Sequence, residues 1–239
     1  HGVCGTIKAL DLWLQHAETN FVLLGIKVKY SKPVSQYQEL TVFGDYTDTL
    51  GRLELFAAGV RCQTIEFELT DASEDPNLQE HGLIARSGEA SSCLDLSIGD
   101  CAGLSGAVDI LWDEDIMQAL FPSATRNLPA RQLATVIACS QIVGMKCPGL
   151  HSVFAQLDLR FNSPPICTDA DNHSQLQYRI VSTDERIDRV ELGVGNANVE
   201  GVIEAFFRPP PAQQAGFRQI AAMVSNREFS KQNALIIGG

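Results

Sequence analysis

The sequence lacks the features of several protein classes. It has no apolar run approaching the roughly 18 residues of a membrane span, so we expect no membrane segment. It also lacks a basic excess: 18 Lys and Arg stand against 29 Asp and Glu. The net charge of -11 disfavours nonspecific binding to nucleic acid, because such binding requires Lys and Arg to neutralise phosphates. No signal peptide is recognisable, and we expect a cytoplasmic protein.

The cysteines lack the spacing of a metal site. None forms a C-x-x-C pair, so zinc-ligand spacing is absent and we predict no metal site. Their odd number and scattered positions favour reduced, mostly buried thiols. Asp113-Glu114-Asp115 could hold a cation, but a helix N-terminus is the simpler interpretation, because carboxylates are favoured there. The seven cysteines are Cys4, Cys62, Cys93, Cys101, Cys139, Cys147 and Cys167.

A repeat with an offset of 131 residues runs through the sequence. FVLLGIKVKYSKPV (21–34) and SVFAQLDLRFNSPP (152–165) each carry a basic-aromatic step, a small polar residue and a proline. The offset aligns Lys27 with Asp158 and Pro33 with Pro164. The same offset places GVCGTIKALDLW (2–13) on LATVIACSQIVG (133–144). Both segments have apolar residues at helical spacing and little charge, so we expect two enclosed helices.

Each helix is followed by segments with strand character. In the first copy these are YQELTVFGDYT, LGRLELFAAGV and CQTIEFELT, with turns at Asp48 and Gly59. In the second they are SQLQYRIVST, ERIDRVELGV and ANVEGVIEAFFR, with turns at Thr183-Asp184 and Gly195-Asn196. A buried helix wrapped by a curved antiparallel sheet is the hotdog architecture. The sequence therefore predicts an α+β protein with a double hotdog.

The repeat sets the expected boundaries. Residues 1–70 form the first hotdog, without its N-terminal part of roughly fifty residues, and the acidic, proline-containing stretch 71–92 is a linker. Residues 93–210 form the second hotdog, with a first strand over 93–104 and a short helix over 112–121. Residues 211–239 form a linker helix, over 212–224, and a strand over 233–237.

Both ends of the chain suggest an internal piece of a longer polypeptide. The chain opens on His1 rather than Met and stops at LIIGG. We expect the final strand and Gly238-Gly239 to be the truncated start of a Rossmann-like dinucleotide-binding domain. An ordinary strand ending in a turn is the alternative interpretation.

The residues also resemble a known family. His1-Gly2 at the start of an apolar helix, followed by a strand ending KVKYSKPV, resembles the MaoC-like (R)-specific enoyl-CoA hydratases and acyl dehydratases. CPGLHSVFAQLDLRF (147–161) resembles the corresponding piece of a second hotdog, and ALIIGG resembles the opening of a short-chain dehydrogenase/reductase. The resemblance implies a parent enzyme that joins a dehydratase to a ketoacyl reductase. It implies no cofactor for the hotdog region, and NADP or NAD for the C-terminal domain.

The family's reaction is reversible addition of water to a trans-2-enoyl thioester by an Asp/His pair acting on one water. The resemblance makes Gly2 the oxyanion N–H donor and makes His1 a pocket residue, with the Asp/His pair upstream of residue 1. In the second copy, the corresponding stretch WDEDIMQALFPSATRNLPARQ has no histidine, and Gln132 aligns with His1 at the offset of 131. We therefore expect the second copy to be catalytically silent and to house the acyl chain, and the 239-residue chain to be inactive alone.

The expected partner is an acyl-CoA or acyl-carrier-protein thioester. Lys27, Lys29 and Lys32 form a basic strip, and Arg160 matches Lys29 in the second copy. These residues are candidates for contact with coenzyme A phosphates or phosphopantetheine, and the alternative is a solvated strand face. A hotdog without its first strand would expose an edge, which favours a homodimer.

Two other functions fit part of the sequence. A non-catalytic hotdog module would use its cavity to bind an acyl thioester, or would serve dimerisation. A polyketide synthase dehydratase would carry an Asp on the second helix after Leu-Pro. Leu128-Pro129 is present here, but the helix ATVIACSQ has no Asp, which counts against that family.

Overall fold

The computed structural model describes residues 2–35, 37–47, 49–72, 92–162, 174–211, 215–225, 228, 230 and 232–233. The chain divides into two units, residues 1–208 and residues 209–239. In the second unit, the helix expected over 212–224 is shorter, α5 (Phe217–Met223), and none of its residues is buried. The expected strand over 233–237 and Gly238-Gly239 lie almost wholly outside the described residues.

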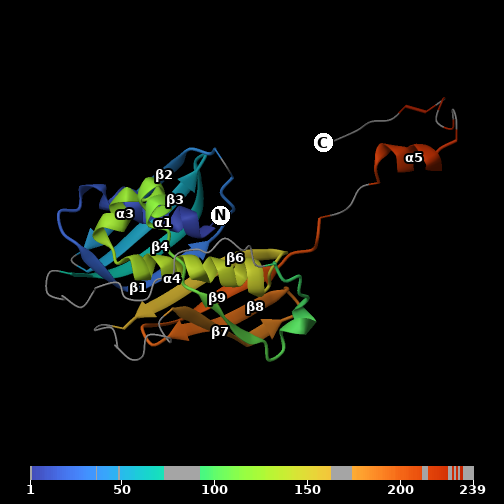
Figure 1. Cartoon of the computed structure of the whole chain (residues 1–239). Helices are drawn as coiled ribbons and strands as arrows, with labels where there is room; N and C mark the ends of the chain where they lie inside the picture. Colours follow the sequence, from blue (N-terminus) through green and yellow to red (C-terminus); the bar gives the residue numbers. More distant parts are fainter. Residues whose placement is uncertain are drawn as a thin grey trace. The chain divides into compact units, whose positions relative to one another are not determined.

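The first unit is built on one antiparallel sheet of nine strands in the order β2-β3-β4-β1-β6-β9-β8-β7-β5. Two hairpin meanders, β2-β3-β4 and β7-β8-β9, flank the central pair β1-β6 (Figure 1). The strands are β1 (Phe21–Tyr30), β2 (Leu40–Thr47), β3 (Leu50–Ala57), β4 (Val60–Asp71), β5 (Ser105–Asp109), β6 (Ser152–Phe161), β7 (Gln175–Asp184), β8 (Arg189–Asn196) and β9 (Val199–Phe207).

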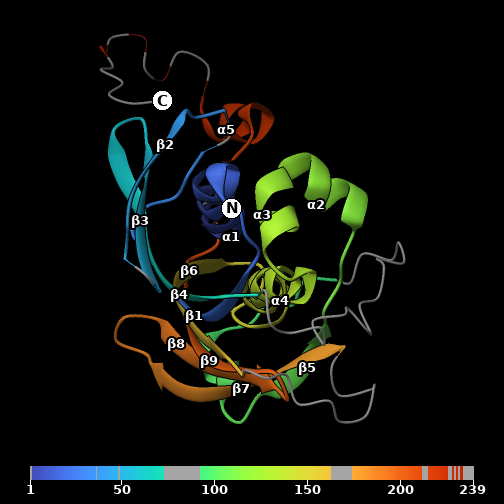
Figure 2. The ribbon, with the colours of Figure 1, turned by 90° about the vertical axis from the view of Figure 1, so that its left-hand side faces the viewer.

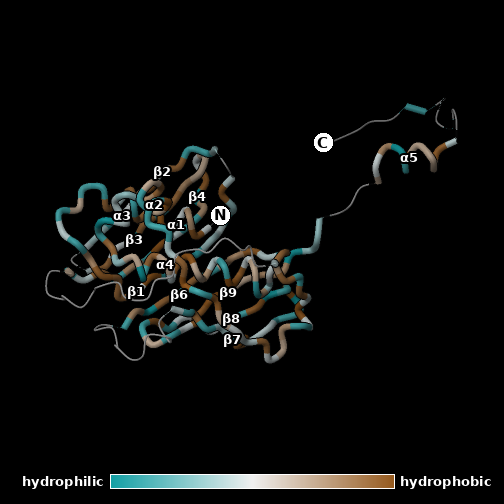
Figure 3. The backbone as a smooth tube through the Cα atoms, viewed as in Figure 1, coloured by the Kyte–Doolittle hydropathy of each residue, from teal (hydrophilic) through white to brown (hydrophobic). Residues whose placement is uncertain are grey.

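Two apolar helices fill the curves of this sheet, as predicted. Helix α1 (Gly2–Trp13) lies against β2, β3 and β4, and α4 (Ala130–Gln141) lies over the second half (Figure 2). Apolar positions alternate with polar ones along the strands (Figure 3), and the apolar ones join the two helices in one core. The short helices α2 (Glu114–Leu120) and α3 (Pro122–Asn127) precede α4, and α3 packs on α1. This is the double hotdog.

The strand pairing confirms the repeat at an offset of 131. Strands β1 and β6 pair so that Lys27 lies opposite Asp158, its own counterpart in the repeat. Each strand also carries an irregularity at the matching place: the register shifts between Leu23 and Gly25 in β1, and between Phe154 and Gln156 in β6. An approximate twofold axis therefore passes between Lys27 and Asp158.

The helices follow a different offset, which corrects one assignment. The hydroxyl of Thr6 lies 3.3 Å from the carbonyl oxygen of Gly2, four residues earlier, and the hydroxyl of Thr135 lies 2.8 Å from that of Arg131, so the matching helical positions are 129 residues apart. The second half has two more residues between helix and strand, and there α4 continues into a π turn, Ile142–Lys146. The counterpart of residue 1 is then Ala130, and Gln132 does not occupy that place.

One expected strand was wrong, and other expected elements are present with bounds that differ by one to a few residues. Residues 93–104 do not form a strand. Ser97 and Asp100 form a reciprocal capping box that favours the short 3-10 helix Ile98–Cys101, and the edge strand is β5. The helix expected over 112–121 is α2, and a second short helix begins at Pro122. The turns near 184 and 196 lie at 185–188 and 197–198, and Asp48 lies outside the described residues.

No helix of the described residues is both long and apolar enough to cross a membrane. The expected linker 71–92 begins with the last residue of β4, and residues 73–91 lie outside the described part of the chain.

Candidate functional site

A buried polar cluster lies beneath the first turn of α1. The side-chain amide of Gln63, on β4, donates to the carbonyl of Gly2 at 2.8 Å. The hydroxyl of Thr6 lies 3.0 Å from the amide oxygen of Gln63 and 3.3 Å from the hydroxyl of Tyr30. Thr6 and Gln63 are 0% and 1% exposed, so these bonds satisfy groups that cannot reach water.

Two glycines allow the helix to approach the cluster this closely. A Cβ at Gly2 would lie 2.8 Å from the ring atoms Cδ1 and Cε1 of Tyr30. A Cβ at Gly5 would lie 2.7 Å from the amide nitrogen of Gln63. The spacing of three residues places both glycines on the same face of α1, which explains the HGVCG pattern.

Tyr30 brings the second half of the molecule to the cluster. Its ring meets Phe154 of β6 edge to face, with the ring centroids 4.9 Å apart. Burial raises the pKa of Tyr30 well above its ordinary value, so the phenol stays protonated and can donate a hydrogen bond across the usual pH range.

Within the described residues, the second half has no such cluster at its helix. Tyr30 pairs with Gln63 across β1 and β4, and the matching pair across β6 and β9 is Phe161 with Val199. Both polar positions are therefore apolar in the second half. This difference makes the start of α1 the candidate functional site.

Gln132 has a structural role next to this site. Its amide nitrogen donates to the carbonyl of Leu23 at 2.8 Å, and its amide oxygen accepts from the N–H of Leu23 at 2.9 Å. These bonds satisfy backbone groups at the place where β1 shifts register. Gln132 thus joins α4 to the central strand of the other half.

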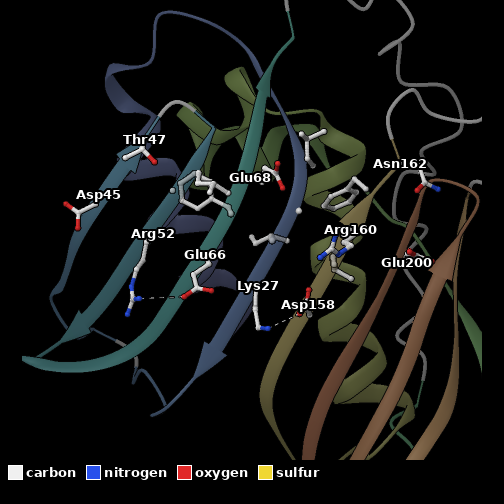
Figure 4. A pocket seen from close by; sticks show the side chains of 18 residues that line it. Lys27, Asp45, Thr47, Arg52, Glu66, Glu68, Asp158, Arg160, Asn162 and Glu200 are labelled. Atoms are coloured by element: carbon white, nitrogen blue, oxygen red, sulfur yellow. Dashed lines mark ion pairs between the residues drawn. The ribbon is translucent and has the colours of Figure 1, made fainter.

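The predicted basic residues that belong to strands lie on the other face of the sheet from α1. Ile26 and Val28 are buried in the core, so Lys27 between them points to the opposite face. Its amine lies 3.2 Å from a carboxylate oxygen of Asp158 (Figure 4). Arg160 lies on the same face, Lys29 and Lys32 are exposed, and His1 lies outside the described residues. The structure does not bring Lys27 or Arg160 together with Gly2.

A groove of about 750 Å³ crosses that outer face (Figure 4). Its charged lining combines three cations with five carboxylates, and it holds a second ion pair, Arg52–Glu66 at 3.7 Å, beside Lys27–Asp158. A phosphate site needs a net positive field, so this lining gives no support to phosphate contacts there. The role of these residues in binding coenzyme A stays a prediction. The cations are Lys27, Arg52 and Arg160, and the carboxylates are Asp45, Glu66, Glu68, Asp158 and Glu200.

A buried carboxylate that the sequence analysis missed lies on α1. Asp11 is 1% exposed, and one oxygen accepts from the backbone N–H groups of Ser123 at 2.7 Å and Ala124 at 3.0 Å. The other oxygen pairs with the amine of Lys8 at 2.8 Å. Asp11 therefore caps α3 and fixes it against α1. A charged residue on the buried side of an apolar helix was the signal for it.

The described residues contain no group of three or more His, Cys, Asp or Glu side chains that could hold a metal. Two of the five histidines, His16 and His151, are described. No hydrogen bond or ion pair within the described ranges joins either imidazole to a carboxylate, so this part of the chain shows no Asp/His pair.

The comparisons with known proteins agree with the fold. A scan of protein-family models finds no match, and a search of curated proteins finds none either. Among solved structures, a MaoC-like dehydratase has a TM-score of 0.53 at 13% identity, over 86% of this chain and 83% of that chain. This similarity shows the hotdog fold of the chain.

Two further solved structures have lower TM-scores. Full-length peroxisomal multifunctional enzyme type 2 from Drosophila melanogaster matches at 13% identity with a TM-score of 0.48, over 84% of this chain and 40% of that chain. Acyl-CoA thioesterase II TesB2 from Mycobacterium marinum matches at 9% identity with a TM-score of 0.44, over 88% of this chain and 91% of that chain.

Proposed function

We propose that this chain is the thioester-binding region of an acyl dehydratase or enoyl-CoA hydratase, in which the start of α1 receives the thioester group. The enzyme would add water reversibly to trans-2-enoyl thioesters as part of a larger multidomain protein. The observation that carries the proposal is the polar cluster of Gly2, Thr6, Tyr30 and Gln63, which occurs in one half only of the described sheet. The hotdog fold and the sequence resemblance support trans-2-enoyl thioesters as the proposed substrate class.

The chemistry follows from the position of Gly2. An α-helix leaves its first N–H groups without partners in the helix, and its dipole makes that end positive. Water addition to an enoyl thioester builds negative charge on the thioester oxygen. An N–H fixed at that oxygen stabilises the charge as it develops. Gln63 holds the peptide that follows this N–H, because it donates to the Gly2 carbonyl.

The described residues supply binding and polarisation without a proton-transfer pair. We therefore expect the 239-residue chain to bind trans-2-enoyl thioesters without converting them. The Asp/His pair of the proposed enzyme would come from outside residues 1–239. The partner would be an acyl-CoA or acyl-carrier-protein thioester, and no cofactor is proposed for this region.

The test compares two substitutions of one residue. Gly2→Pro removes the N–H and is tolerated in the first turn of a helix, whereas Gly2→Ala keeps the N–H. Both add a Cβ against Tyr30, so the pair isolates the hydrogen bond. Calorimetric titration with crotonyl-CoA should show binding to the wild type, and at least about tenfold weaker binding to Gly2→Pro than to Gly2→Ala.

Two results would contradict the proposal. Equal affinities of Gly2→Pro and Gly2→Ala for crotonyl-CoA would show that the Gly2 N–H does not bind the ligand. Equal affinities of the wild type for crotonyl-CoA and free coenzyme A would show that the thioester group is not recognised. Hydration of crotonyl-CoA by the chain at enzyme-like rates would show that the Asp/His pair lies within it. Release of free thiol would indicate thioester hydrolysis instead.

A non-catalytic binding module is the second candidate. It is favoured by the lack of an Asp/His pair among the described residues. The two functions differ in the parent protein: only the enzyme would turn over crotonyl-CoA when the upstream sequence is present.

A further inference from the structure

Two buried thiols are in contact in the second half of the molecule. The sulfur atoms of Cys101 and Cys147 lie 3.6 Å apart, and both residues are 0% exposed. The two cysteines are 46 residues apart in the chain, so the fold brings them together. Within the described residues, no other two cysteine sulfurs are in such contact. This pair is therefore the place where the protein can form a disulfide bond with little movement.

Backbone hydrogen bonds hold the two segments that carry these thiols side by side. The N–H of Leu94 donates to the carbonyl of Met145 at 2.9 Å. The N–H of Leu150 donates to the carbonyl of Leu94 at 2.8 Å. The segment that leads to Cys101 therefore runs along the chain on both sides of Cys147. Because the backbone already fixes this arrangement, the sulfur–sulfur distance can shorten to the about 2.0 Å of a disulfide mainly through side-chain rotation.

Cys101 belongs to a surface segment, although its own side chain is buried. It is the single buried residue of the stretch 92–107, and it ends the short 3-10 helix Ile98–Cys101. A segment with so few buried side chains opens at a lower free energy than the core of the sheet. Local opening therefore gives a small molecule access to the Cys101 thiol while the rest of the fold stays intact.

We propose that Cys101 and Cys147 are a site of reversible oxidation, at which a small-molecule disulfide such as oxidised glutathione produces a disulfide bond. In the first exchange, the Cys101 thiolate attacks one glutathione sulfur, and the first reduced glutathione leaves with the proton of Cys101. In the second exchange, the Cys147 thiolate attacks the sulfur of Cys101, and the second reduced glutathione leaves with the proton of Cys147. The two protein thiols are oxidised, and one glutathione disulfide is reduced to two thiols.

The contact between the thiols sets the order of the two attacks. Burial raises the pKa of both groups, and at Cys147 the nearby Cys101 raises the pKa further. At Cys101 the hydrogen bond from Cys147 opposes the increase in pKa, because it stabilises the thiolate. Cys101 therefore ionises first and makes the first attack. Oxidation should be slow at neutral pH and faster at mildly alkaline pH, since the thiolate is the reacting form.

The disulfide would join the surface segment to the end of α4, since Cys147 directly follows the π turn Ile142–Lys146. A covalent link opposes the opening of the 3-10 helix that ends at Cys101. The N–H of Leu104 reports on this opening, because it donates to the carbonyl of Cys101 at 3.0 Å. Hydrogen exchange at Leu104 should slow by at least about tenfold on oxidation and return to its original rate on reduction.

The test incubates the folded 239-residue chain with oxidised glutathione and maps its peptides by mass spectrometry. We expect a pair of peptides linked through Cys101 and Cys147, which has lost two hydrogens and which dithiothreitol separates. Cys101→Ser should leave Cys147 as a free thiol. Cys62→Ser and Cys139→Ser make the same change at buried cysteines outside the pair, and these controls should form the link as the wild type does.

Cys93 offers the competing link. Its sulfur lies 2.7 Å from the carbonyl oxygen of Gly144 and 3.5 Å from Sδ of Met145, so it contacts the same π turn. A disulfide from Cys93 to either buried thiol would overturn the proposed pairing. A glutathione adduct on Cys101 that never closes onto Cys147 would overturn the proposal, and so would two thiols that stay free at equilibrium with oxidised glutathione.

Discussion

Gln63 and Thr6 form the buried bond on which the geometry of the candidate site depends. The Thr6 hydroxyl lies 3.0 Å from the amide oxygen of Gln63, and the amide nitrogen lies 2.8 Å from the Gly2 carbonyl. Gln63→Leu keeps the volume nearly constant and removes both bonds, at about 1 kcal/mol each, so unfolding should become easier by about 2 kcal/mol. Thr6→Val leaves the buried amide oxygen without its donor, which also costs about 2 kcal/mol.

The double variant distinguishes a shared bond from two separate effects. When Thr6 and Gln63 are both replaced by apolar residues, neither the hydroxyl nor the amide oxygen remains to lack its partner. The free energy of unfolding should then fall by about 2 to 3 kcal/mol instead of about 4. Urea unfolding of the four proteins, followed by circular dichroism, measures the coupling of about 1 to 2 kcal/mol. Costs that add to within about 0.5 kcal/mol would refute the bond between Thr6 and Gln63.

Two further predictions concern buried groups. Asp11→Ala should lower the free energy of unfolding by about 3 kcal/mol, because it leaves two buried N–H groups of α3 without an acceptor. Asp113→Ala removes one exposed cap and should cost about 1 kcal/mol, so equal costs in urea unfolding would contradict the assignment. Burial raises the pKa of Cys139 to about 12, so its thiol stays protonated and unreactive at mildly alkaline pH. Iodoacetamide should modify the exposed Cys4 faster than Cys139, and peptide mapping that finds the two modified equally fast in the folded protein would contradict the burial of Cys139.

The central strands β1 and β6 could be predicted as a matching pair because they keep the offset of 131 residue by residue. Lys27 and Asp158 mark the same strand position, and they prove to be partners on the internal axis. The sequence repeat aligned α1 with α4 at an offset of 131, two residues more than the offset of 129 in the structure. The error arose because Ile142 and Val143 continue the apolar pattern of α4 through its π turn. A pattern of apolar residues alone does not show an added residue within a turn.

The site was predicted only in part. Gly2 was found through a resemblance, whereas Gln63 was missed, although it lies on the inward side of β4 with Ile65 and Phe67. A polar residue at an inward position of a strand requires a partner, and that partner can be found only when the helix above it is placed. The basic residues show the opposite case: Lys27 and Arg160 formed a pattern in the sequence, but their side chains lie on the other face of the sheet from Gly2.

The central claim is that the start of α1, and not the start of α4, receives the thioester. Titration of the isotope-labelled chain with crotonyl-CoA, followed by amide chemical shifts, tests it directly. The account predicts saturable shifts at Gly2 and Thr6, with the matching residues Arg131 and Thr135 unchanged. Shifts at Arg131 and Thr135 instead, or at none of the four, would contradict it.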